Sequence, residues 1–366
     1  MAKLTIIRSG RWFFFNTLAL ALVGYLLFVS ASLGLLSRSG ARFNLVTIKQ
    51  LVILLVSLVL FFIFSRIDYR WWRRLSFWFF AVSVIATLLV FIPGLGFSAN
   101  GATRWIKVGS LTIQPSEFLK LAFVLYLGAW LARSRASNRT WYAGLLPLLV
   151  LFGIVSAIII AEPDIDTLVI IFISGLAMFF VGGARWRHLL LIALIALLAI
   201  AVVAYFKPYI RSRISTFLQP EVNTLSSSYQ INQSLIALGS GGLFGRGFGQ
   251  SIQKFKYLPE PIGDSIFSVA GEEFGLLGTS IIVFLFLGLS IFGLKIAAVA
   301  PTPYGRLIGV GIVIMITVGA FINITAMTGL IPLTGTPLLF VSHGGTALLV
   351  ALLAAGIVLN IARQSK

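Results

Sequence analysis

Apolar segments long enough to cross a lipid bilayer recur along most of this chain. About 20 apolar residues in a helix that rises 1.5 Å per residue span the roughly 30 Å of hydrocarbon in a membrane. Of the 366 residues, 59% are hydrophobic and only 10% are charged, which excludes an ordinary soluble domain. The sequence therefore predicts an all-α polytopic membrane protein with about ten transmembrane helices, near residues 12–34, 46–65, 75–93, 115–132, 142–160, 166–183, 188–206, 265–294, 306–328 and 338–362.

Lysine and arginine residues fall mainly on one side of these segments. Sixteen lie at the two ends of the chain and in alternate short loops, whereas the opposite short loops hold five. Because basic short loops stay in the cytoplasm, both ends of the chain are predicted to be cytoplasmic. The net charge of +18 then reflects topology and not nucleic-acid binding. The chain reads as one domain, 1–366, in which residues 207–264 form a large extracytoplasmic loop between the seventh and eighth spans, beginning with a short interfacial helix.

Acidic residues gather on the opposite, outer side. Of ten Asp and Glu residues, only Asp68 lies in a predicted cytoplasmic loop. Asp264 stands out because it follows a glycine-rich, basic loop and opens the eighth span. A carboxylate is costly where water is scarce, so Asp264 is the candidate catalytic residue, although an N-cap of the following helix is the alternative. A partly desolvated carboxylate suits a general base, but nearby cations oppose the rise in its pKa, so the direction of the shift stays open.

Further polar motifs supply candidate substrate-binding residues. Glu117 and Lys120 share one helix face and form either a structural ion pair or the floor of a cavity. Arg104 and Lys107 flank a tryptophan and would either bind a phosphate or anchor a helix end. The full candidate set for the substrate or its cavity is Glu117, Lys120, Arg104, Lys107, Gln233, Arg246, Lys254, Lys256, Ser342 and His343.

The glycine-rich segment 239–249 permits sharp turns or a close approach of its backbone to a ligand. It lacks the Gly-Lys-Ser/Thr ending of a nucleotide-binding loop, which disfavours nucleotide binding. Arg246, Lys254 and Lys256 form a positive rim that suits a diphosphate, and amides such as Gln233 suit a sugar.

Two other segments are predicted to border the same site. Glu162, Asp164 and Asp166 could bind a divalent cation through oxygen, so Asp264 and Asp164 are candidate metal ligands, although Asp164 could equally cap the sixth helix. Residues 329–345 join the last two spans with two prolines, several glycines and no formal charge, which predicts a re-entrant turn that lines a cavity. Within this turn His343 is either a proton carrier or a structural residue.

Taken in order, these motifs resemble those of the SEDS (shape, elongation, division and sporulation) family, and the resemblance covers nearly the whole chain. The matching segments are 104–106, 114–120, 162–164, 239–245, 257–260, 264–267, 329–332 and 342–345. Residues 251–260 resemble the division branch, FtsW, more than the elongation branch, RodA. The chain departs from the family pattern in four places, with Ile262-Gly263 for His-Thr, Asp166 for Gly, Leu339 for Pro and His343 for Tyr.

The resemblance implies a peptidoglycan glycosyltransferase in the bacterial cytoplasmic (inner) membrane. Such an enzyme polymerises lipid II, an undecaprenyl-diphosphate-linked disaccharide peptide, on the outer face. It works with a class B penicillin-binding protein transpeptidase and other division or elongation proteins, amid membrane lipid and without nucleic acid. By similarity Asp264 is the essential acid, Glu117 and Lys120 are a polar pair in the cavity, and a divalent cation (Mg or Mn) is an optional aid. A lipid II flippase and a non-catalytic scaffold are the alternatives; the scarcity of acids on the inner side favours chemistry outside.

Overall fold

The computed structural model describes residues 2–37, 40–99, 102–109, 111–133, 140–218 and 227–365. In this part of the chain a helix occupies each of the ten predicted apolar segments. These helices are α1 (Ala2–Ser32), α2 (Gly40–Phe64), α3 (Arg70–Leu88), α4 (Pro115–Leu131), α5 (Leu146–Ala161), α6 (Ile165–Val181), α7 (Trp186–Phe206), α11 (Ile266–Ala298), α12 (Pro303–Met327) and α13 (Gly345–Gln364).

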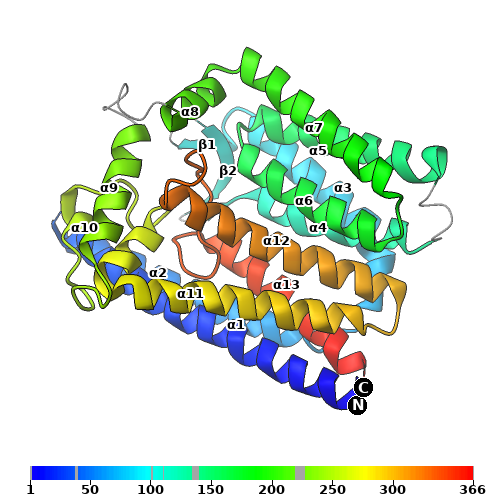
Figure 1. Cartoon of the computed structure of the whole chain (residues 1–366), viewed down its shortest axis with the longest axis horizontal. Coiled ribbons are helices and arrows are strands. Elements are labelled where there is room, and N and C mark those ends of the chain that lie inside the picture. The colour runs from blue at the N-terminus through cyan, green and yellow to red at the C-terminus, as the bar shows by residue number, and fades with distance from the viewer. Residues whose placement is uncertain are drawn as a thin grey trace.

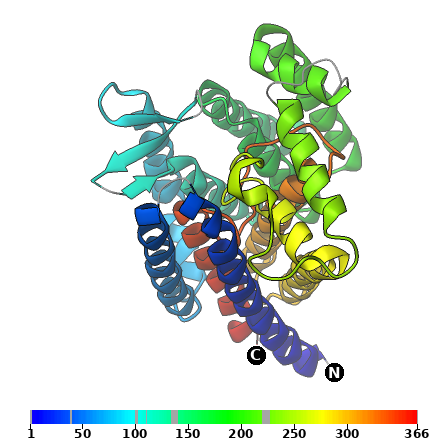
Figure 2. The ribbon, with the colours of Figure 1, turned by 90° about the vertical axis from the view of Figure 1, so that its left-hand side faces the viewer.

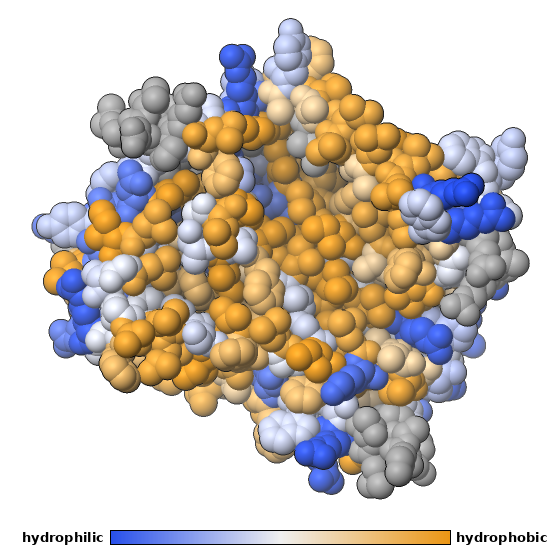
Figure 3. Space-filling view, in the orientation of Figure 1, coloured by the Kyte–Doolittle hydropathy of each residue, from blue (hydrophilic) through white to orange (hydrophobic). Residues whose placement is uncertain are grey.

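The helices form a multi-pass membrane bundle. Among the described residues, eight helices are long and apolar enough to cross a membrane. The helices α4 and α6 have 17 residues each, and α4 carries two charges, so the total of ten spans stays a prediction. Figure 3 shows apolar side chains covering the middle of the bundle's surface, with hydrophilic residues gathered toward its ends. In Figure 1 the two chain ends lie side by side at one end, and α9 and α10 lie at the other.

Local sequence explains where several helices begin. Pro115 stands at the first turn of α4 and Pro303 at the first turn of α12, where a missing N–H costs nothing. The Thr302 hydroxyl caps α12 by accepting a hydrogen bond from the Gly305 N–H at 3.0 Å. Asp164 caps α6, as one reading of the sequence predicted.

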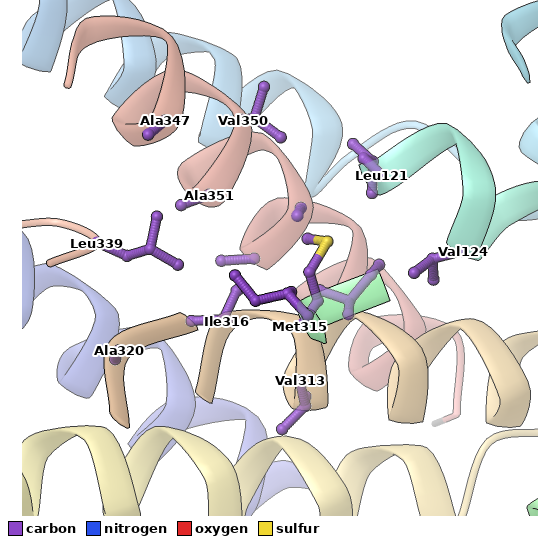
Figure 4. Close-up of a cluster of buried hydrophobic side chains, with 14 of the residues drawn as sticks. Leu121, Val124, Val313, Met315, Ile316, Ala320, Leu339, Ala347, Val350 and Ala351 are labelled. Atoms are coloured by element: carbon purple, nitrogen blue, oxygen red, sulfur yellow. The ribbon is translucent and has the colours of Figure 1, made fainter. Parts of the chain in front are cut away.

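The packed core is centred on α12 and α13, whose described side chains are largely buried. Helix α12 contacts α4, α6, α11 and α13, so it is surrounded on most sides. Figure 4 shows Met315 and Ile316 of α12 within the buried cluster, with Leu121 and Val124 on α4 and Val350 and Ala351 on α13. Because the core holds the ends of these helices in fixed positions, the loops that join them are fixed as well.

Smaller elements occupy the loops. They are the short helices η1 (Leu33–Ser37), η2 (Leu89–Phe91) and η4 (Trp141–Leu145), the helices α8 (Pro208–Leu218), α9 (Ser227–Ser240) and α10 (Gln253–Lys256), and the strands β1 (Gly96–Ala99), β2 (Ala102–Val108) and β3 (Leu111–Ile113). The strands form one antiparallel sheet in the order β1-β2-β3, at the side of the bundle (Figure 2). Sequence analysis placed no strand here, because a short hairpin resembles a polar loop between two long apolar segments. Helix α8 lies where the amphipathic segment predicted one.

Residues 329–344 contain no regular helix, as the turn residues predicted, but the predicted start of the last span at 338 was wrong. Helix α13 begins only at Gly345. The preceding chain runs back over the bundle, and Leu339 packs among Ala320, Ala347 and Ala351 (Figure 4). This contact anchors the segment that approaches Asp264.

Helix α11 is interrupted at Gly275, where φ is 65° and ψ is −160°. The glycine-rich segment enters the break and makes hydrogen bonds between backbones. The Leu276 N–H donates to the Gly242 carbonyl at 2.9 Å, and the Gly247 N–H donates to the Glu273 carbonyl at 2.9 Å. A β-carbon at Gly245 would lie 2.2 Å from the Glu273 carbonyl oxygen, so only glycine permits this approach. The glycines of residues 241–247 thus serve contact with α11 itself.

Candidate active site

Asp264 lies between α10 and α11, where two other segments hold its backbone. The Asn323 side chain on α12 donates to the Asp264 carbonyl at 2.8 Å and to the Thr336 carbonyl at 2.8 Å. The Ser342 hydroxyl donates to the Gly263 carbonyl at 2.7 Å, and the His343 N–H donates to the Ile262 carbonyl at 2.7 Å. The segment 329–344, called the clasping segment below, therefore holds the backbone of residues 262–264 in place.

Asp264 is half-buried, and the partial removal of its carboxyl group from water, together with the charges around it, sets its protonation. Burial, together with the negative charges of Glu260 and Asp166, raises its pKa to about 7. The cations Arg213 and Arg104 oppose the rise. The direction that the sequence left open is thus upward, and the carboxyl group can exchange a proton near neutral pH.

Arg213 on α8 is the cation that lowers the pKa of this carboxylate most. A β-carbon placed on Gly335 would lie 3.8 Å from both Asp264 Oδ2 and Arg213 Nη2. The guanidinium also lies 3.9 Å from Asp166 Oδ2, which accepts a hydrogen bond from the Gly335 N–H at 3.0 Å. Arg213, Asp166 and Asp264 therefore surround one glycine of the clasping segment.

The acidic loop before α6 lies beside this group and is held by Arg104 on β2. The Arg104 side chain donates to the carbonyls of Glu162, at 3.1 Å, and Pro163, and its guanidinium lies 3.9 Å from Asp164 Oδ1. Asp164 also accepts hydrogen bonds from Thr167, with 2.9 Å between the two side-chain oxygens. Burial and the Asp164 charge raise the pKa of Glu162 to about 8, against the effect of Arg104.

The polar pair of α4 forms as predicted. Lys120 Nζ lies 2.8 Å from Glu117 Oε1, and both residues are buried. The N-cap residue Gln114 connects this helix to the acidic loop, since its side-chain amide lies 3.3 Å from Asp164 Oδ2. The pair thus lies in the first turns of a helix that borders the site, and its role in substrate binding stays a prediction.

Two of the three residues of the predicted positive rim pair with carboxylates of α11. Lys254 is fully buried, and its Nζ lies 2.6 Å from Glu273 Oε1. Arg246 pairs with Glu272 at 3.6 Å, while Lys256 is exposed. Lys254 therefore cannot line an open rim as it stands, because its charge is neutralised inside the bundle.

The other candidate substrate-binding residues are Lys107, Gln233 and His343. Lys107 is exposed, and its ammonium lies 5.8 Å from the centre of the Phe97 ring. Gln233 is half-buried on α9, and its neighbour Gln230 makes the contact to the site, donating to the Ser265 hydroxyl at 3.0 Å. The His343 ring stacks on Phe28 with 5.7 Å between ring centres, so the link of His343 to the site is its backbone N–H.

A divalent cation stays a prediction. Among the described residues, no three acidic or histidine side chains converge as metal ligands do. Of the two predicted ligands, Asp164 already accepts hydrogen bonds from Thr167 and Gln114. Its donor oxygens are thus used within the protein, and the chemistry below includes no metal.

Sequence analysis missed Arg213 and Asn323 as members of this site, and it named Asp166 only within the acidic cluster that could bind a cation. Arg213 is one of several cations in an amphipathic segment, and the sequence does not show which of them turns toward α11. Asn323 offers a signal in hindsight, because an amide inside a 25-residue apolar helix needs partners.

Comparison with known proteins identifies relatives along the whole chain. The family model for FtsW, RodA and SpoVE, described as a cell cycle protein family, matches residues 11–366. The chain is 40% identical to stage V sporulation protein E of Bacillus subtilis over 318 residues, which cover 87% of each chain. It is 35% identical to the probable peptidoglycan glycosyltransferase FtsW of Coxiella burnetii, covering 97% of this chain and 96% of that protein.

Solved structures agree with this assignment. One chain of a peptidoglycan synthase complex that coordinates polymerisation and crosslinking is 26% identical, with a TM-score of 0.80 and coverage of 96% of this chain and 97% of that one. The rod shape determining protein RodA of Thermus thermophilus is 25% identical, with a TM-score of 0.69 and coverage of 96% of each chain. The chain belongs to the FtsW/RodA/SpoVE family of cell cycle proteins.

Proposed function

We propose that this protein is a peptidoglycan glycosyltransferase that polymerises lipid II at the outer face of the bacterial cytoplasmic membrane, with Asp264 as general base. The relatives that carry the name of this activity match over most of their length. The observation that carries the residue assignment is a carboxyl group with a pKa of about 7, clasped by the segment 329–344 and flanked by Arg213. A pKa near the working pH is what a general base requires.

In the proposed step, one Asp264 oxygen accepts the proton of a sugar hydroxyl on one lipid-linked molecule. The hydroxyl oxygen then forms a bond to the anomeric carbon of the growing chain. The bond from that carbon to the diphosphate oxygen breaks, and the lipid diphosphate leaves with the electron pair. Arg213 and Arg104, which both lower the pKa of Asp264, would balance the negative charge that develops on the diphosphate.

Release of the proton completes the cycle. A carboxylic acid with a pKa of about 7 loses its proton to water readily at neutral pH, whereas one buried beyond the reach of any cation would retain it. The two arginines therefore have a second effect, because they keep the pKa of Asp264 from rising further.

The test is polymerisation of lipid II by the purified protein carrying Asp264→Asn, measured with and without a class B penicillin-binding protein. This partner class is proposed because a similar chain belongs to a complex that coordinates polymerisation with crosslinking. Removing the base is expected to reduce the rate by at least about 100-fold. Asp68→Asn is the matched control, because this acid lies at the other end of the bundle and its carboxylate accepts a hydrogen bond only from the Arg70 N–H among the described residues.

The result also separates the alternatives. Full polymerisation by the Asp264→Asn protein would disprove the base assignment. Movement of lipid II across vesicles without any polymer, in the unmodified protein, would support a flippase instead. A protein that lacks both activities with and without its partner would fit a scaffold.

A further inference from the structure

A basic cavity of about 240 Å³ lies far from Asp264, between the first turns of α3 and α12. It is at the end of the bundle that the lysine and arginine distribution assigns to the cytoplasm. Three arginines make up nearly half of the residues that line it. The lining residues are Arg70, Arg73, Arg74, Ala132, Thr302, Pro303 and Tyr304.

The charge of this cavity is not neutralised by carboxylates in the described part of the chain. The nearby Asp68 carboxylate accepts a hydrogen bond from the Arg70 backbone N–H, at 2.9 Å, and makes no ion pair within 4.0 Å with the three guanidinium groups. The guanidiniums of Arg70 and Arg74 lie over the rings of Tyr69 and Trp71, at 6.0 Å and 5.7 Å. Three adjacent cations repel one another, so an anion bound among them is stabilised. Guanidinium groups pair with phosphate through two parallel hydrogen bonds.

A second and independent observation is an unused hydroxyl group in the wall of the cavity. Tyr304 is 2% exposed, and its hydroxyl has no hydrogen-bond partner among the described residues. The neighbouring Thr302 hydroxyl, in contrast, contacts the Tyr69 hydroxyl at 2.9 Å and caps α12. Leaving a buried hydroxyl unpaired costs about 1–3 kcal/mol, so a bound acceptor oxygen would relieve that cost.

The surface beside the cavity favours a lipid over a soluble anion. Below the arginines, α3 presents a continuous apolar stripe, with Trp78 67%, Val82 61% and Ile85 57% exposed. These residues follow one another at helical spacing, so they form a track along the bundle toward the middle of the membrane. A phospholipid would place its phosphate among the arginines and its acyl chains along this track. Basic pockets between membrane helices on the cytoplasmic side bind anionic headgroups in this way.

We propose that this cavity binds the phosphate headgroup of an anionic phospholipid of the inner leaflet. Arg73 and Arg74 hold the phosphate, the Tyr304 hydroxyl donates to it, and Trp78 contacts the first part of an acyl chain. The site is separate from the proposed active site and its existence does not depend on the activity assigned there.

The test measures the affinity of the full-length protein in detergent for phosphatidylglycerol and for phosphatidylcholine, with bound lipid counted by native mass spectrometry. The protein is expected to retain phosphatidylglycerol selectively. Arg73→Gln with Arg74→Gln should weaken this binding roughly 30-fold, because each arginine near the membrane surface contributes about 1 kcal/mol. Tyr304→Phe should weaken it roughly fivefold without any change of charge. The control, Arg8→Gln with Arg11→Gln, removes two exposed arginines of α1 and should leave the affinity unchanged.

Three results would overturn the proposal. Equal weakening by the control pair would mean that binding follows the general surface charge. Displacement of the lipid by millimolar inorganic phosphate would identify a soluble phosphate as the ligand. Binding of a hexaglutamate peptide that depends on Arg73 and Arg74, without lipid binding, would point to an acidic protein segment. If the double arginine variant does not fold, the Tyr304→Phe protein decides the question, and an unchanged affinity there refutes the site.

Discussion

The two charges that flank Asp264 should move the pH dependence of catalysis in opposite directions. Arg213 lowers the pKa of Asp264 and Glu260 raises it. Arg213→Gln therefore raises this pKa, and Glu260→Gln lowers it. A general base acts in its deprotonated form, so a higher pKa moves the acidic limb of the rate profile to higher pH.

The structure sets the size of the effect for Arg213. The two 3.8 Å distances from a Gly335 β-carbon place Arg213 Nη2 and Asp264 Oδ2 no more than about 8 Å apart. Two unit charges at about 8 Å with an effective dielectric constant of about 20 interact by about 2 kcal/mol, equivalent to about 1.5 pKa units. The Arg213 side chain is 34% exposed, and water screens it, so the expected shift is about one unit.

The assay follows lipid II polymerisation from pH 5.5 to 9 at substrate concentrations well below KM. The unmodified protein should show an acidic limb with a midpoint near 7. The midpoint should move to about 8 for Arg213→Gln and should fall below 7 for Glu260→Gln. At pH 7 the arginine variant should retain about a tenth of its maximal rate, but at pH 9 it should recover almost completely.

A shifted midpoint is what shows the effect of Arg213 on the pKa of Asp264. If Arg213 acted only by balancing the charge of the diphosphate, its loss would lower kcat/KM at every pH and the midpoint would stay in place. An unmoved midpoint in both variants would refute the assignment of the titrating group to Asp264. The Glu260 change leaves intact the backbone carbonyl that receives the N–H groups of Gly263 and Ser265, so the turn before Asp264 should persist.

Two further substitutions test the framework of the site. Gly24→Ala would place a β-carbon 2.1 Å from the Phe340 carbonyl oxygen and should push the clasping segment 329–344 away. This variant should lower both the activity and the midpoint of thermal unfolding in detergent. Gly153→Ala meets no atom within 4 Å and should stabilise α5 by up to about 1 kcal/mol. Equal stability of both variants would contradict the packing described. Lys254→Met leaves the buried Glu273 charge without its cationic partner and should destabilise the protein by about 3–5 kcal/mol. Adding Glu273→Leu to this variant should restore most of the lost stability. If calorimetry shows no gain in stability for the double variant, the buried pair is not charged.

Hydropathy and loop charge were sufficient to predict the bundle, because a membrane-spanning helix must be apolar over a nearly fixed length. They failed where the backbone is irregular. The strands β1 to β3 lie in a short polar interval, and α13 starts seven residues after the predicted start, because residues 338–341 are apolar yet packed as loop. Hydropathy reports the surroundings of a residue and does not report its backbone conformation.

For the site, the sequence pointed to Asp264 because an acidic residue among apolar neighbours can be recognised from the sequence alone. The sequence did not show which charged residues lie beside Asp264 in the folded protein. Arg213 precedes it by about fifty residues and Asp166 by about a hundred, and only folding brings them to Gly335. Lys254 shows the opposite error, because a basic residue in a glycine-rich loop suggested a ligand until the structure revealed Glu273 beside it.

The break in α11 has a mechanical consequence. The Leu276 N–H donates to the Gly242 carbonyl and the Gly247 N–H donates to the Glu273 carbonyl, so backbone hydrogen bonds join the glycine-rich segment to α11 on both sides of the break at Gly275. Pulling the two apart would break these bonds together, so the segment 241–247 and the start of α11 should move as a single unit. Any force that a partner applies to the glycine-rich segment would then be delivered to the residue just before that helix, which is Ser265, and through it to Asp264.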